Sequence, residues 1–127
     1  MRKKYCKIQF VFLKGSTYIC DMSEREKNIM KKIKARIEQK NPLAQIILFG
    51  SHARGKSNKN SDWDILILLN QPQVNRNTER EYRDELYELE LEIGEPISTF
   101  VFSKTEWEQK HLMTPLYQNI KREGINL

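Results

Sequence analysis

Two aspartates, Asp62 and Asp64, stand two residues apart at the start of an apolar run, DWDILILL. Side chains alternate between the two faces of a β-strand, so both carboxylates are expected on one face, with α-carbons about 6.6 Å apart. Carboxylates this close raise each other's pKa unless a positive charge neutralises them. The pair could therefore hold Mg²⁺ or Mn²⁺, or be a polar strand entrance in which Asp62 accepts hydrogen bonds from loop amides.

A second chemical feature, the pair Gly50 and Ser51, ends the preceding apolar run. Glycine permits close approach of a ligand, and free backbone amides at the start of a helical turn can bind phosphate. A Gly-Ser pair is also an ordinary turn. If Gly50 and Asp62 share one site, the two strands must run antiparallel, which the eleven-residue connector between them allows.

The elements that must position these residues follow from capping and apolar periodicity. Capping boxes at Ser23 with Glu26 and at Thr78 with Glu81 begin two amphipathic helices, and further N-caps at Ser103 and Thr114 begin two short ones. The two long helices are predicted over 23–40 and 78–93, and the three core strands over 44–49, 63–69 and 96–102. The second long helix crosses over to a third strand parallel to the second. The predicted class is α+β, a small mixed sheet packed against helices.

The stretch LFGSHARGKSNKNSDWDILILL resembles the signature of the polymerase-beta-type nucleotidyltransferase superfamily, a Gly-Ser turn followed after ten residues by Asp-x-Asp. The resemblance covers about 23–103 and is strongest to the minimal nucleotidyltransferases of the MntA-like antitoxin group. It implies transfer of AMP from ATP to a hydroxyl, with Asp62 and Asp64 as catalytic ligands of two metal ions, Mg²⁺ or Mn²⁺. It also implies that Gly50 and Ser51 bind the nucleotide phosphates, while Arg54 either assists them or is a solvated loop residue.

The chain departs from that family pattern at the third carboxylate, which the family usually carries on the strand after the crossover helix. Here Ser98 or Thr99 stands at that place. Glu95, at the start of the strand, is the candidate third catalytic and metal-binding residue, or else an exposed residue before a proline. Without it the protein would be slow, or would bind nucleotide without turnover. His52 is expected to be a solvent-facing loop residue.

The partner that the resemblance implies is a HEPN-type helical protein, which the enzyme would neutralise as an antitoxin by AMPylation of a hydroxyl. One alternative is a catalytically weak module that binds nucleotide or partner. A further alternative is a small-molecule nucleotidyltransferase of the aminoglycoside type, which would normally need an additional acceptor-binding domain.

Composition limits the remaining classes. The 127 residues favour one domain, 22–127, preceded by a peripheral segment, 1–21. The net charge of +5 is concentrated in that segment, because residues 22–127 hold 17 basic against 16 acidic side chains. Nucleic acid is therefore not favoured as a partner. No apolar run reaches the roughly 18 residues of a membrane span, and both cysteines, Cys6 and Cys20, lie in the opening segment, so a cytoplasmic location is expected.

Overall fold

The computed structural model describes residues 22–58 and 60–127, and the predicted peripheral segment 1–21 lies outside them. The elements in chain order are α2 (Glu24–Lys40), β1 (Gln45–Phe49), α3 (Ser51–Arg54), β2 (Trp63–Leu69), α4 (Arg76–Ile93), β3 (Ile97–Ser103), α5 (Lys104–Lys110), α6 (Pro115–Glu123) and β4 (Ile125–Asn126). The predicted α+β class is confirmed. None of the helices in this described part is long and apolar enough to cross a membrane.

The four strands form one mixed sheet in the order β3-β2-β1-β4. β1 runs antiparallel to β2, and β2 runs parallel to β3, as the shared site and the crossover helix required. β4 was not predicted. It pairs antiparallel with β1 through Ile47 opposite Asn126 and Leu48 opposite Ile125. A strand of two residues is too short to show alternation of apolar and polar residues, so β4 can be recognised only from its pairing with β1.

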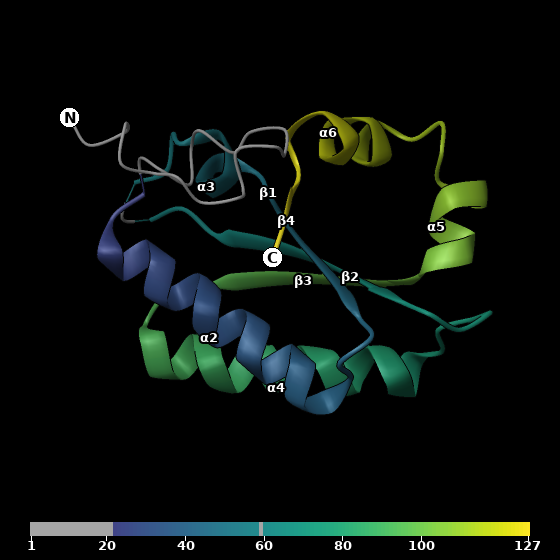
Figure 1. The fold of residues 1–127 in the computed structure, drawn as a ribbon, viewed down its shortest axis with the longest axis horizontal. Coiled ribbons are helices and arrows are strands. Elements are labelled where there is room, and N and C mark those ends of the chain that lie inside the picture. Colours follow the sequence, from purple (N-terminus) through teal and green to yellow (C-terminus); the bar gives the residue numbers. More distant parts are fainter. Residues whose placement is uncertain (1–21, 59) are drawn as a thin grey trace.

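Helices α2 and α4 lie side by side on one face of the sheet (Figure 1). The α2 capping box at Ser23 and Glu26 is present, and its apolar stripe of Ile29, Ile33 and Ile37 is buried. Helix α4 begins two residues before the predicted start, because the Asn75 side chain, rather than that of Thr78, caps it. The alternate positions of β1 and β2 that include Trp63 and Ile65 complete this main core.

The opposite face of the sheet is covered in part by α5 and α6 (Figure 1). Leu66 and Leu68 of β2 pack there with Trp107 of α5 and Ile120 of α6. Because side chains alternate along a strand, Asp64 projects from this same face. The fold therefore places α5 and α6 on the face that carries Asp64.

Candidate active site

The turn after β1 has a conformation that only glycine adopts readily. Gly50 has φ 80° and ψ −159° and is the N-cap of the short helix α3. A β-carbon at Gly50 would overlap Oδ2 and crowd the carboxyl carbon of Asp64. Ser51 follows directly as the first residue of α3. The predicted phosphate-binding turn and the predicted metal-binding strand are therefore in contact.

The two aspartates lie at the entrance of β2 next to β3. Asp64 is in register with Phe49 of β1 and with Ser98 of β3. The Ser98 hydroxyl donates a hydrogen bond of 3.3 Å to Oδ2 of Asp62. Burial raises the pKa of the Asp64 carboxyl, and the negative charge of Asp62 raises it further, although the nearby His52 and Arg54 act in the opposite direction. The ionised form of Asp64 is thus disfavoured mainly by its burial and secondly by the charge of Asp62.

An unpredicted carboxylate, that of Glu123, lies against the turn. The Gly50 N–H donates to Glu123 Oε2 at 3.0 Å. Arg54 Nη1 donates to Oε2 at 2.9 Å and to Oε1 at 3.1 Å. Glu123 is the last residue of α6, and only 14% of its side chain is exposed. A glutamate near the end of the chain carries no local signal of such a role, since only the return of α6 over the sheet brings it here.

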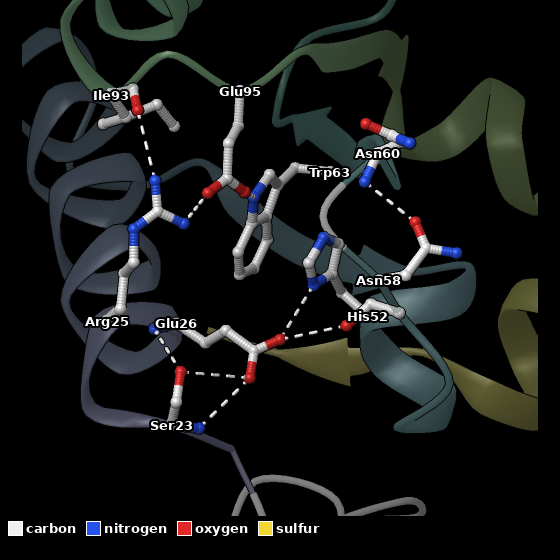
Figure 2. A network of polar contacts seen from close by, with 10 residues as sticks. Ser23, Arg25, Glu26, His52, Asn58, Asn60, Trp63, Ile93 and Glu95 are labelled. Carbon is white, nitrogen blue, oxygen red and sulfur yellow. Dashed lines mark hydrogen bonds and ion pairs between the residues drawn. The ribbon is translucent and has the colours of Figure 1, made fainter.

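The expectation that His52 faces solvent is wrong, because the residue is 3% exposed. Its ring stacks on Trp63 with centroids 3.7 Å apart, and its Nδ1 lies 3.0 Å from Oε2 of Glu26. Ser57 donates to the same oxygen at 3.1 Å, so Glu26 joins the start of α2 to the turn and to the loop (Figure 2). Burial raises the pKa of Glu26, but hydrogen bonds from the Ser23 amide, His52 and Ser57 outweigh it and leave the pKa lowered.

The structure does not bring Glu95 to the two aspartates. Glu95 Oε1 accepts a hydrogen bond of 2.8 Å from Trp63 Nε1, and its other oxygen forms an ion pair with Arg25 of α2 (Figure 2). Trp63 projects from the face opposite Asp62 and Asp64. In residues 22–58 and 60–127 no group of three or more His, Cys, Asp or Glu side chains is arranged to hold a metal. Glu95 thus links Arg25 of α2 to Trp63 of β2. The residue of β3 that lies beside the aspartates is Ser98.

The chain is similar to known proteins both in sequence and in fold. The family model described as "Nucleotidyltransferase domain" matches residues 30–125. No curated protein matches the sequence significantly. A solved toxin–antitoxin structure with AMP-PNP is 22% identical, with a TM-score of 0.56 over 76% of this chain and 69% of that chain. A mutant of the toxin–antitoxin MntA-HpeT is 21% identical, with a TM-score of 0.55 over 77% of this chain and 70% of that chain. At these identities the two structures show a shared fold.

Proposed function

Because this chain belongs to the nucleotidyltransferase domain family, we propose that it transfers AMP from ATP to a hydroxyl group of a protein partner. The observation that carries the proposal is the convergence of the Gly50 amide and the Arg54 guanidinium on one oxyanion, the Glu123 carboxylate, beside Asp64. A backbone N–H and an arginine that together bind a carboxylate can bind a phosphate oxygen in the same way. Such a group next to two carboxylates suits a nucleoside triphosphate.

The aspartates fit a divalent metal by their chemistry. Asp62 and Asp64 supply hard oxygen donors at the start of β2, and burial together with the charge of Asp62 raises the pKa of Asp64, which a bound cation would oppose. Magnesium in phosphoryl-transfer sites is held by one or two carboxylates together with substrate phosphates. When bound, such a metal would neutralise charge on the attacking and leaving oxygens. Glu95 is not included among the ligands, because Trp63 and Arg25 hold its carboxylate.

The remaining residues of the site would bind and orient the nucleotide. The Gly50 N–H and Arg54 would hold the phosphates that leave as pyrophosphate, and the absence of a side chain at Gly50 lets them approach Asp64. Ser51, as the first residue of α3, would add its hydroxyl and amide. An oxygen–phosphorus bond to the acceptor forms while the bond between the α-phosphorus and the pyrophosphate oxygen breaks, and the proton of the acceptor hydroxyl is released to solvent. Orientation and charge stabilisation are the main contributions that a protein makes to this class of reaction.

The acceptor in our proposal is a hydroxyl on a helical toxin of the HEPN type, so the protein would act as an antitoxin in the cytoplasm. Two structures that share the fold are toxin–antitoxin structures, one of them with AMP-PNP. Transfer to a small molecule of the aminoglycoside type is a weaker candidate, because the two structures that share the fold are toxin–antitoxin structures.

A non-catalytic nucleotide-binding or partner-binding module is the second candidate function. One observation favours it. Ser98, a neutral residue, stands on β3 where a third carboxylate would complete the site, and Glu95 is engaged elsewhere. Such a module would bind nucleotide at Gly50 and Arg54 without transferring AMP.

The test is incubation of the protein with ATP labelled on the α-phosphate, magnesium and a candidate acceptor, a helical protein of the HEPN type. We expect label on the partner, and a loss of at least about a hundredfold in Asp62→Asn and in Asp64→Asn, since transition-state charge stabilisation is removed. Asp84→Asn, on the exposed surface of α4, is the matched control and should keep full activity. Nucleotide binding without label in the wild type would instead support the binding module.

A further inference from the structure

The interaction between Glu123 and the turn has the features of a bound ligand. Its two oxygens accept three hydrogen bonds, one from the Gly50 amide and two from Arg54, at distances between 2.9 and 3.1 Å. Charge-assisted bonds of this kind are among the strongest that side chains form. The carboxylate is mostly buried, which protects these bonds from water. Glu123 therefore occupies the oxyanion-binding position, as a phosphate would.

We propose that Glu123 is an intramolecular competitor for the nucleotide phosphates, and that triphosphate binds by displacing its carboxylate from Gly50 and Arg54. This inference rests on the proposed function, because it assigns those two residues to the phosphates. In this proposal Glu123, a residue of α6, lowers the affinity of the site for the nucleotide and excludes anions that bind more weakly.

Glu123 and a phosphate cannot both use this position. Gly50 has one backbone N–H, and it is already donated to Glu123. Two anions in contact would also repel each other, and the negative charges of Asp62 and Asp64 lie nearby. The charge of Glu123 already acts on Asp64, since it is one of the causes that raise the pKa of that carboxyl. Binding of triphosphate therefore requires Glu123 to leave.

The backbone around Glu123 stays in place in this exchange. Gly124 donates its N–H to the Ile120 carbonyl at 2.7 Å, and a β-carbon at Gly124 would lie 2.8 Å from the Ile47 side chain. The next residue, Ile125, is fully buried and pairs with Leu48 of β1. The movable part is thus the Glu123 side chain, which has several rotatable bonds and can swing from Arg54 toward solvent.

The principal experiment measures the affinity of magnesium tripolyphosphate, and then of magnesium AMP-PNP, by calorimetry. Removing the charge in Glu123→Gln should tighten binding of both about tenfold, because a larger fraction of the protein is competent to bind. Glu106→Gln is the matched control. It removes one charge from an ion pair with Lys110 on α5, and should leave both affinities unchanged.

A double-mutant cycle separates competition at Arg54 from a general effect of charge. In the Arg54→Ala background, Glu123→Gln should change the affinity for tripolyphosphate by much less than tenfold. If the full gain persisted there, or if Glu123→Gln bound tripolyphosphate no better than the wild type, the competition would be excluded while the proposed function stood. If neither the wild type nor any variant bound either probe, the proposed function would fail as well.

A measurement on the wild-type protein avoids any dependence on the folding of the variants. The ¹³C resonance of the Glu123 side-chain carboxylate, assigned by comparison with Glu123→Gln or Glu123→Ala, should shift to the value of a solvated glutamate when magnesium tripolyphosphate saturates the site. A resonance that stays unchanged at saturation would show that Glu123 remains on Arg54, and would overturn the proposal.

Discussion

At the scale of single residues, the negative charge of Asp64 suits a bound cation but lowers the stability of the folded protein. Asp64 is partly buried beside Asp62, and burial together with that neighbouring charge raises the pKa of its carboxyl above the ordinary value of 3.8. A folded protein that binds this proton more tightly than the unfolded chain is destabilised by ionisation of the carboxyl. The cost is absent at a pH below the ordinary value, and it develops as the pH rises through the pKa of the folded state.

Asp64→Asn should therefore stabilise the protein while it removes activity. We expect its melting temperature in metal-free buffer to exceed that of the wild type by a few degrees at pH 7, and the difference to disappear near pH 4. Asp84→Asn, an exposed aspartate of α4, should show no such difference. Thermal unfolding followed by circular dichroism at several pH values checks this. A less stable Asp64→Asn at pH 7 would contradict the expected sign of the effect.

At the scale of elements, the unit from β1 through α3 to β2 holds the site, and its turn depends on the absence of a side chain. Gly50 combines a backbone conformation that is nearly exclusive to glycine with direct contact to Asp64. Gly94, the C-cap of α4, has a left-handed backbone with φ 76° and ψ 19°, but no atom lies within 4 Å of where its β-carbon would stand. Gly50 thus needs glycine for two reasons, a more restricted backbone conformation and close approach to Asp64, whereas Gly94 has only the milder strain of a left-handed residue.

Gly50→Ala should reduce the free energy of unfolding by about 3 kcal/mol or more, since both strain and overlap with Asp64 are introduced. Gly94→Ala should cost only about 1 kcal/mol, the strain of a left-handed alanine. Urea denaturation of both variants measures the difference. Equal losses would contradict the prediction, because they would mean that neither the contact with Asp64 nor the more restricted backbone of Gly50 adds to the cost of a left-handed alanine.

At the scale of the whole molecule, the end of the chain completes both the sheet and the site. β4 adds an edge strand to β1, Ile125 enters the main core, and Leu127 donates its N–H to the Ile46 carbonyl at 2.9 Å. The backbone of the preceding pair, Glu123 and Gly124, is held in place as a result. Helices α2 and α4, by contrast, are joined at the surface by ion pairs such as Arg36 with Glu92, which contribute little individually.

Ile125→Ala should destabilise the protein by about 2–5 kcal/mol, the usual cost of a cavity at a fully buried position. Leu43→Ala removes a comparable apolar side chain that is 75% exposed, and should change stability by less than about 0.5 kcal/mol. Denaturant unfolding gives both values. A small loss for Ile125→Ala would show that β4 is not part of the cooperative core.

Much of the fold could be predicted because its signals are local. A helix cap and the apolar periodicity of a helix or strand depend only on near neighbours in the chain. These signals predicted α2, β1, β2, α4 and β3 with ends that lie within two residues of the observed ones. The start of α4 differs because Asn75 and Thr78 are both good caps, and in the structure it is Asn75 whose side chain accepts from the Thr78 N–H. The two-residue strand β4 depends on long-range pairing alone.

The sequence by itself determined that Gly50 and Asp62 can share one site only if their two strands run antiparallel, and β1 and β2 have that topology. Only the tertiary structure decided which other charges join them. His52 lies within the motif and Glu95 lies at the start of the strand predicted to reach it, yet both side chains contact Trp63, on the opposite face of the sheet. Glu123 is distant in sequence, yet α6 carries it to Gly50 and Arg54. Local spacing determines the face from which a side chain leaves its own strand, whereas a contact between elements depends on how the whole chain packs.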